Sequence, residues 1–347
     1  MNLGRLNNIL EQYPPYRSRQ AYSVVFDNLF SSWEEATNLP KAFRAILARE
    51  CPLQIDAEMH ESGNGKTVKA VIQLDDGVAI ETVLMRHQDG RNTVCVSSQA
   101  GCSLACDFCL TGARGFMRDL TAGEIVGQVL LFARRLKTEG ERVKNVVFMG
   151  MGEPFLNYEA VMKAIRLMNN RDGLKIGARR ISISTVGIIE GIRKLSREPL
   201  QLNLSISLHA PDDRLRSRLM PVNRQYPIEK ILDAVAEYIR LTRRRVMIEY
   251  LLLRDLNDSP AAAERLAVLL RRSLGWLFFV NLIYYNPTGK YLPSPPERIR
   301  EFQRILESRG ISVTRRYRFG REIKAACGQL AGSSRIRGSL NITTTQE

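Results

Sequence analysis

The segment TVCVSSQAGCSLACDFCLTG, residues 93–112, decides how the rest of the chain is interpreted. It begins with β-branched and small residues that predict a buried β-strand. Three of the six cysteines of the chain then follow within eight residues, at Cys102, Cys106 and Cys109. In α/β proteins the functional groups lie in loops after the carboxyl ends of strands. We therefore take this segment as the first strand and the first functional loop of the principal domain.

From Asn92 onward the sequence repeats strand, loop and helix. The strands are near-continuous apolar runs, as expected for parallel strands covered on both faces. Helical patterns lie between them, one with a capping box at Thr121 and Glu124 and one that follows Pro227. Six such units predict an α/β fold with a partly open βα barrel, although a doubly wound sheet fits the pattern nearly as well. The six predicted strands span residues 93–98, 145–150, 180–185, 202–208, 245–253 and 278–285.

The chain divides into a small N-terminal appendage, a core and a tail. Residues 1–50 have the pattern of short helices with polar joints, and residues 51–90 contain an alternating stretch around Asp75-Asp76-Gly77. That alternation with a turn at its centre predicts a β-hairpin. Residues 91–335 form the predicted core, and residues 336–347 are a polar tail.

The chain is strongly basic. Its 347 residues include 51 Lys and Arg against 36 Asp and Glu, a formal net charge of +15. This excess indicates a polyanionic partner, and nucleic acid fits better than a membrane because no basic amphipathic helix is evident. The sequence also shows no apolar run of membrane-spanning length and no signal peptide. We expect a cytoplasmic protein, in which clustered cysteines bind metals or catalyse more often than they form disulfides.

Cys102, Cys106 and Cys109 have the spacing of ligands to one compact metal centre. A structural zinc ion needs a fourth ligand, which Cys95 or one of the three histidines could supply. A [4Fe–4S] cluster held by three cysteines leaves one iron open, and an open iron can bind a substrate. The spacing alone leaves both kinds of centre open.

The C-x3-C-x2-C pattern, with Phe108 before its last cysteine, resembles the radical S-adenosylmethionine (SAM) superfamily. From about residue 14 to 333 the chain resembles one branch of it, the RlmN/Cfr family of dual-cysteine ribosomal RNA methyltransferases. This resemblance implies a partial (βα)6 radical SAM barrel, with Cys102, Cys106 and Cys109 on a [4Fe–4S] cluster. The segments that carry it are CVSSQAGC (95–102), FMGMGEP (148–154), SISTVG (182–187), SLHAP (207–211), LMPVN (219–223), VNLIYYNP (280–287) and AACGQLAG (325–332).

The same resemblance implies a set of residues that bind SAM. Gly152 and Glu153 correspond to the edge that holds the SAM amino group, since a carboxylate accepts hydrogen bonds from an ammonium. The other implied SAM contacts are Ser184, Ser207, Leu208, His209 and Asn286. Without the resemblance, Glu153 is a solvated residue of a turn and His209 is an ordinary hydrogen-bonded residue of a loop or core.

Three catalytic residues are also implied by the resemblance. Cys327 matches the cysteine that carries a methyl group, Cys95 the resolving cysteine, and Glu81 the base that removes a proton from the adenine. From the residues alone, each cysteine is a small buried apolar side chain and Glu81 a surface carboxylate at a strand edge. Cys51 matches no functional residue of the family, and we interpret it as structural.

The implied reaction is methylation at C2 of one adenosine in the peptidyl-transferase region of 23S rRNA. It consumes two SAM molecules per turnover. One methylates Cys327, and the other is cleaved to a radical that activates this methyl group, because the electron-poor C2 cannot attack SAM directly. An adenosine of a tRNA anticodon loop is a second substrate that the family allows. We expect naked or immature RNA, a monomeric enzyme and an electron donor such as flavodoxin with flavodoxin reductase.

Several alternatives stay open at this stage. The same rRNA adenosine could be methylated at C8, the antibiotic-resistance activity of Cfr-type enzymes. A non-catalytic, zinc-containing RNA-binding protein and a radical SAM enzyme for a small metabolite are further classes. The basic segments 241–246 and 314–324 would contact RNA phosphates, with Tyr317 or Phe319 stacked on a base, and residues 1–50 would form an RNA-docking module.

Overall fold

The computed structural model describes residues 3–316, 320 and 322–330. Within them, ten strands form one sheet in the order β1-β2-β3-β4-β7-β8-β9-β10-β11-β12, and β5 and β6 form a separate pair. The strands are β1 (Ala57–Glu61), β2 (Thr67–Gln73), β3 (Ala79–Arg86), β4 (Asn92–Val96), β5 (Gln99–Gly101), β6 (Phe116–Asp119), β7 (Asn145–Phe148), β8 (Ile181–Thr185), β9 (Asn203–Ser207), β10 (Val246–Leu252), β11 (Phe278–Tyr284) and β12 (Val313–Arg315).

The parallel part of the sheet runs from β4 to β12 in chain order, without a reversal. A doubly wound sheet would place its first strand inside the sheet and reverse the order there, so that alternative is wrong. The six predicted core strands are present within two residues at each end. Strands β1 and β12 were not predicted, because AEMHE is polar and VTR has only three residues. In the described part of the chain β1 and β12 end the sheet without pairing to each other, so the barrel is open.

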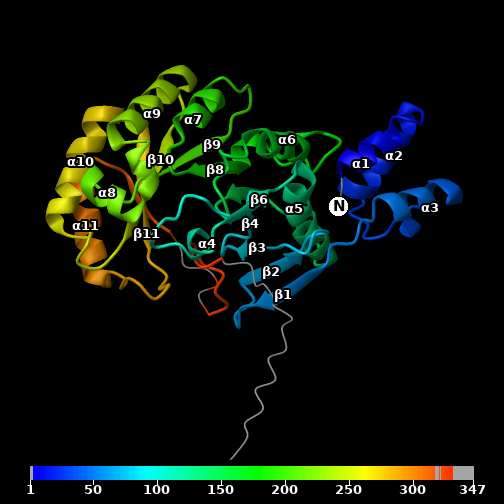
Figure 1. Ribbon diagram of the computed structural model, residues 1–347, viewed down its shortest axis with the longest axis horizontal. Coiled ribbons are helices and arrows are strands. Elements are labelled where there is room, and N and C mark those ends of the chain that lie inside the picture. The colour runs from blue at the N-terminus through cyan, green and yellow to red at the C-terminus, as the bar shows by residue number, and fades with distance from the viewer. Residues whose placement is uncertain (1–2, 317–319, 321, 331–347) are drawn as a thin grey trace, which may run out of the picture.

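Helices α5, α6, α7, α9, α10 and α11 follow the outer side of the curved sheet, whereas α1 to α3 lie beside α5 (Figure 1). Among the described residues, none of the helices has the length and apolar character needed to cross a membrane. The helices are α1 (Leu3–Leu10), α2 (Pro15–Phe26), α3 (Lys41–Glu50), α4 (Leu110–Ala113), α5 (Ala122–Thr138), α6 (Tyr158–Asn169), α7 (Ile189–Ser196), α8 (Asp213–Leu219), α9 (Ile228–Thr242), α10 (Pro260–Leu274) and α11 (Pro296–Ser308), with short 3-10 turns η1 (Trp33–Glu35), η2 (Ala178–Arg180) and η3 (Pro221–Arg224).

Helix α5 forms as its sequence predicts. The Thr121 hydroxyl accepts a hydrogen bond from the Glu124 N–H at 3.2 Å, and the Glu124 carboxylate accepts one from the Thr121 N–H at 2.7 Å. This capping box satisfies backbone donors at the helix start. The apolar residues spaced along one face, from Ile125 to Leu136, are buried against the sheet. The local sequence therefore fixes both the start of α5 and its orientation.

The predicted hairpin is present as β2 and β3, with Gly77 at φ +81° in the turn. It continues the main sheet, because β3 pairs antiparallel with β4 and sets Val83 opposite Cys95. The N-terminal helices share the apolar core of the barrel. They are also joined to α5 by the hydrogen bond from Lys137 Nζ to the Asn28 carbonyl at 2.6 Å. The appendage thus supports β4, the strand that carries Cys95.

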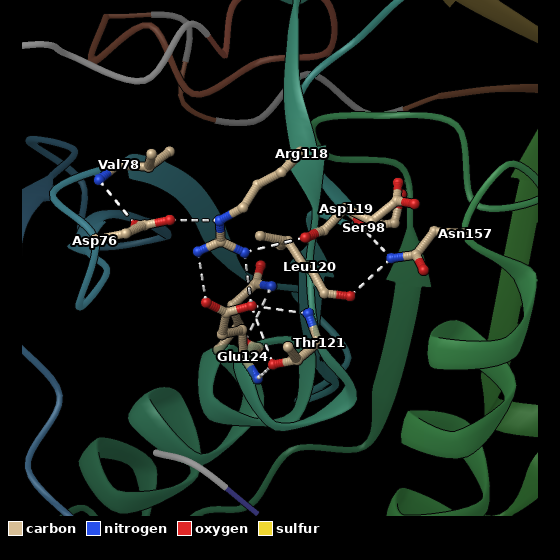
Figure 2. A network of polar contacts seen from close by, with 10 residues as sticks. Asp76, Val78, Ser98, Arg118, Asp119, Leu120, Thr121, Glu124 and Asn157 are labelled. Carbon is tan, nitrogen blue, oxygen red and sulfur yellow. Dashed lines mark hydrogen bonds and ion pairs between the residues drawn. The ribbon is translucent and has the colours of Figure 1, made fainter. Parts of the chain in front are cut away.

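A polar network fixes both ends of the segment that holds the three clustered cysteines (Figure 2). Arg118 forms two hydrogen bonds with the Glu124 carboxylate, at 2.7 and 3.0 Å, and an ion pair with Asp76 in the hairpin turn. The Asn157 amide donates to the carbonyls of Ser98 and Leu120, both at 2.8 Å. Ser98 precedes the cysteines and Leu120 follows them, so Asn157 clamps the segment at its base.

Replacing Asn157, which bonds to both ends of the cysteine segment, should destabilise the fold. In Asn157→Ala the Ser98 carbonyl keeps the hydrogen bond from the Leu120 N–H at 3.2 Å, whereas the buried Leu120 carbonyl loses the Asn157 donor. We expect the free energy of unfolding to fall by about 1–3 kcal/mol in urea titrations. Lys163→Ala, at an exposed position of the same helix, serves as the control and should cost less than about 0.5 kcal/mol. Equal losses in both variants would contradict the clamp.

Candidate active site

The three clustered cysteines border one cavity above the carboxyl ends of the parallel strands. We call it the cysteine cavity. The loop is tight, because a Cβ on Gly101, at φ +77°, would lie 2.0 Å from the Gly115 carbonyl oxygen. Of the residues implied by the family resemblance, those that border this cavity are Cys102, Cys106, Cys109, Gly152, Glu153, Ser184, Ser207, His209 and Cys327.

The thiols of the cavity are suited to a metal centre that several sulfurs share. Burial raises the pKa of Cys102 to about 11, and burial together with the neighbouring thiols raises that of Cys106 further. Free, these thiols keep their protons at neutral pH, so metal binding must release protons. No three His, Cys, Asp or Glu side chains in the described residues converge at the spacing of a single metal ion. Three cysteines that border a common cavity are the donor set of an iron–sulfur cluster with one open iron.

The glycine-rich edge after β7 brings a buried carboxylate to the cavity. A Cβ on Gly152, at φ +93°, would lie 2.4 Å from the Gln99 Cβ, so only glycine fits this approach. The two Glu153 oxygens accept hydrogen bonds from the N–H groups of Phe155 at 3.1 Å and Val186 at 2.9 Å. Burial nevertheless raises the pKa of Glu153 to about 7. The interpretation of Glu153 as a solvated turn residue is therefore wrong.

The strands β8 and β9 contribute small polar groups. The hydroxyl oxygens of Ser184 and Ser207 lie 3.4 Å apart at the cavity. The His209 ring accepts a hydrogen bond at Nδ1 from the Leu251 N–H at 3.1 Å, and its burial and the charge of Arg216 lower its pKa to about 3. The ring is therefore neutral, with its proton on Nε2. Leu208 is buried and, among the described residues, is not part of the cavity lining.

A second cavity joins the two remote cysteines. Cys95, Asn286 and Cys327 border it, and Cys327 borders the cysteine cavity as well. We call it the Cys95 cavity. Burial, followed by the nearby Cys327, raises the pKa of Cys95 to about 12. The Asn286 amide donates to the Cys327 carbonyl at 3.4 Å, while its buried Oδ1 has no hydrogen-bond partner in the described structure. That oxygen is suited to accept a hydrogen bond from a bound ligand.

Glu81 lies on β3, on the same face of the strand as Val83, the residue opposite Cys95. Its interpretation as a surface carboxylate is wrong, because only 3% of the residue is exposed. Its carboxylate lies 3.5 Å from Lys69 Nζ, which is also buried. Within the described residues, Glu81 is not part of the lining of either cavity.

The loop of Cys327 is bonded directly to the loop of the clustered cysteines. The Leu110 N–H donates to the Gly328 carbonyl at 2.9 Å, and the Thr111 hydroxyl donates to the Leu330 carbonyl at 2.6 Å. Leu110 follows Cys109 and Gly328 follows Cys327, so these bonds set the position of one cysteine relative to the other. Cys51, by contrast, is buried among the N-terminal helices.

Arg216 was not predicted, although it organises the cavity wall. Its side chain is completely buried and donates to the carbonyls of Val186, Ser207 and Leu208, at the carboxyl ends of β8 and β9. It also donates to Asn223 Oδ1 at 2.8 Å and to the Tyr226 carbonyl at 3.2 Å. Burial lowers its pKa to about 10, so it stays charged at neutral pH. Residues 213–219 contain three arginines with similar neighbours, so the sequence does not distinguish Arg216 from the other two. Its partner Asn223 lies in the quoted segment LMPVN (219–223).

Comparisons with known proteins identify the family. Residues 96–266 match the Radical SAM superfamily. The probable dual-specificity RNA methyltransferase RlmN of Chloroflexus aurantiacus is 46% identical and aligns with 100% of this chain and 94% of its own. The RlmN of Desulforudis audaxviator is 47% identical over 90% of this chain and 98% of its own.

The chain belongs to the RlmN family of radical SAM RNA methyltransferases. A crystal structure of a radical SAM methyltransferase from Sphaerobacter thermophilus agrees with it in fold, with a TM-score of 0.91 and 45% identity. That similarity covers 96% of this chain and 98% of the other. The RlmN family accordingly implies a [4Fe–4S] cluster and SAM for this chain, and RNA as its substrate. The alternatives of a zinc-containing binding protein and of an enzyme for a small metabolite are wrong.

SAM affinity should depend on the ionisation of Glu153. Because its pKa is raised from 4.5 to about 7, protonation favours the folded unliganded protein, and Glu153 lowers stability as pH rises through this window. The family resemblance implies that Glu153 binds the SAM ammonium, and this binding would need the carboxylate. We expect the SAM affinity of the cluster-loaded protein, measured by equilibrium dialysis, to fall toward tenfold per pH unit below about pH 7. In Glu153→Gln the same slope would contradict this role.

Removing the buried guanidinium should disrupt the cavity wall. Arg216→Met leaves five acceptor groups without their donor, and we expect a loss of about 3–5 kcal/mol in the free energy of unfolding. Arg214→Met, an exposed arginine on the same helix, is the matched control and should change stability by less than about 0.5 kcal/mol. A stable Arg216→Met protein with unchanged SAM affinity would disprove this assignment.

Proposed function

We propose that the enzyme methylates C2 of a single adenosine in the peptidyl-transferase region of 23S rRNA. The observation that carries this proposal is that Cys327 borders both the cysteine cavity and the Cys95 cavity. A residue in this position can take up a methyl group on one side and be released by a second thiol on the other. The relatives are named RlmN, and the family resemblance assigns C2 methylation to RlmN-type enzymes and C8 methylation to Cfr-type enzymes.

The [4Fe–4S] cluster, held by Cys102, Cys106 and Cys109, supplies the electron that cleaves SAM when it is bound. The Cys327 sulfur accepts a methyl group from one SAM and carries the methyl carbon that becomes joined to the adenine. Cys95 then attacks the Cys327 sulfur as a thiolate, and the leaving carbon takes up a proton to become the methyl group of the product. A Cys95–Cys327 disulfide remains, which the electron donor must reduce before the next turnover. Two SAM molecules are consumed per turnover, one as the methyl donor and one as the radical source.

The remaining residues orient the substrates and move one proton. Glu153, Ser184, Ser207 and the backbone around Leu208 and His209 hold SAM at the cysteine cavity, and Gly152 gives it room. Asn286 contributes its unpartnered Oδ1. Glu81 removes the proton from the adenine carbon, and its place on the same face of β3 as Val83, opposite Cys95, supports this role.

The partners follow from charge and family. Helices α1 to α3 form an RNA-docking module in this proposal, and the net charge of +15 supports an RNA substrate. An anticodon-loop adenosine of tRNA is a second substrate, and a monomeric cytoplasmic enzyme with a flavodoxin-type electron donor remains our expectation. Of the basic segments, Tyr317 and Phe319 lie outside the described residues.

The regiochemistry can be tested directly. The cluster is reconstituted without oxygen, and the enzyme reacts with SAM, a reductant and unmethylated 23S rRNA. We expect nucleoside mass spectrometry to detect 2-methyladenosine with the wild-type enzyme, none with Cys327→Ala, and wild-type amounts with Cys51→Ala as the control. 8-Methyladenosine would reassign the enzyme to the Cfr-type activity, and product from Cys327→Ala would refute the methyl-cysteine intermediate.

Cys95 should be needed to release the methylated adenine from Cys327, and not to attach the adenine to Cys327. With Cys95→Ala the adenine cannot be displaced from the Cys327 sulfur, so we expect RNA to remain covalently bound to the protein. Labelled RNA should then migrate with the protein on a denaturing gel, and mass spectrometry should map the adduct to Cys327. Free methylated RNA from Cys95→Ala would contradict the resolving role.

A further inference from the structure

A third cavity lies at the opposite end of the barrel from the clustered cysteines. Its lining comes from the residues that begin the parallel strands, and from the turn that joins β3 to β4. We call it the arginine cavity. It has a volume of about 570 Å³. The residues that border it are Met85, His87, Arg91, Thr93, Asn145, Val147, Arg179, Arg180, Ser182, Asn203 and Arg316.

The arginine cavity is strongly positive. Four arginines border it, and the described lining includes no Asp or Glu. Arg179 and Arg180 are exposed on η2, and Arg91 is exposed on the neighbouring turn, where Asp89 contacts it at 2.6 Å. Arg244 lies close behind, donating to Asn203 Oδ1 at 3.2 Å, and its buried Nη1 has no hydrogen-bond partner in the described structure. Burial lowers the pKa of Arg244, and the charge of Arg179 lowers it too. Such a concentration of cations attracts an anion.

The three cavities are contiguous along the barrel axis. Met149, Ile283, Cys327 and Leu330 border both the cysteine cavity and the Cys95 cavity. Met85 and Arg316 border both the Cys95 cavity and the arginine cavity. The shared residues place the three cavities in a row, with the Cys95 cavity, of about 40 Å³, between the other two.

The ion pair of Arg316 and Glu249 lies between the cysteine cavity and the arginine cavity. The guanidinium is within 3.3 Å of the Glu249 carboxylate, which borders the cysteine cavity, while Arg316 itself reaches the arginine cavity. Arg316 also donates to the Met149 sulfur at 2.7 Å. The pair separates the cysteine end from the arginine end, and a nucleotide that enters would meet Arg316 first.

We propose that the RNA strand enters from the amino-terminal end of the parallel strands, with Arg91, Arg179 and Arg180 holding the phosphates that flank the target adenosine. This inference rests on the proposed function. In the proposed function SAM occupies the carboxyl-terminal end, so a base that reaches Cys327 needs a separate approach. The row of cavities offers one when the ion pair of Arg316 and Glu249 moves aside. The target nucleotide must leave its base stack to enter the arginine cavity, whereas the neighbouring phosphates stay at the entrance of that cavity. A single-stranded RNA segment carries one negative charge on each phosphate, and the arginines at the entrance of the arginine cavity attract these charges.

Replacing two arginines at the entrance of the arginine cavity with neutral residues tests the proposal. The double variant Arg179→Gln/Arg180→Gln is compared with Arg300→Gln/Arg304→Gln, which removes two exposed arginines from the outer helix α11. Affinity for a 23S rRNA fragment is measured by filter binding at several salt concentrations, and urea unfolding verifies that each variant is folded. We expect the first variant to bind about 10–50-fold more weakly, with a salt slope lower by about 1.4, and the control to stay within about twofold.

Binding as tight as the wild type in the first variant, or an equal loss in the control, would overturn the entry route. A second measurement locates the strand: 4-thiouridine placed beside the target adenosine should cross-link to the peptide that contains Arg179 and Arg180. Cross-links to the loops that follow β8 and β9 would instead assign entry to the other end and refute the proposal. Absence of methyladenosine with the wild-type enzyme would refute the proposed function, whichever peptide is cross-linked.

Discussion

One buried cation organises the carboxyl-terminal end of the barrel. Arg216 places a charged guanidinium in the interior and uses it to bind backbone carbonyls at the carboxyl ends of two neighbouring strands. Loop carbonyls of this kind cannot form the ladder bonds that strands provide, and burying them without donors would cost about 1–3 kcal/mol each. A single side chain with five N–H groups can satisfy several of them at once. The positions of Ser207 and His209 at the cavity depend on this arrangement.

A second constraint brings together cysteines that are far apart in the sequence. Cys327 is 218 residues from Cys109 in the sequence, yet a backbone bond from Leu110 and a hydroxyl bond from Thr111 hold the adjoining loops together. On the other side, antiparallel pairing with β3 holds Cys95 on β4. Neither contact involves a reacting atom. Hydrogen bonds between the loops of Cys109 and Cys327, and strand pairing around Cys95, therefore fix where these cysteines lie.

Much of the fold could be predicted, because near-continuous apolar runs and one capping box identify six strands and the helices between them. The clustered cysteines were equally visible, since spacing along one loop is enough to bring them together. Burial of Glu81 and Glu153 could not be predicted, because a carboxylate in a turn or a strand has the same sequence whether or not other elements cover it. Arg216 was invisible for a related reason: its partners are carbonyl groups, which every residue has. The chain order of the strands, which distinguishes a barrel from a doubly wound sheet, also depends on contacts between distant segments.

The antiparallel strands β1 to β3 have a consequence for how the protein is made. They pair through short turns, so their contacts are local and form quickly, whereas each parallel pair must first close a long loop. The N-terminal segments also leave the ribosome first. When β4 pairs with β3, its other edge is exposed as a template, and β7 is the next strand to be added. We therefore expect the barrel to assemble in one direction, strand by strand, from the hairpin toward β12, with the loop of Cys327 joining last.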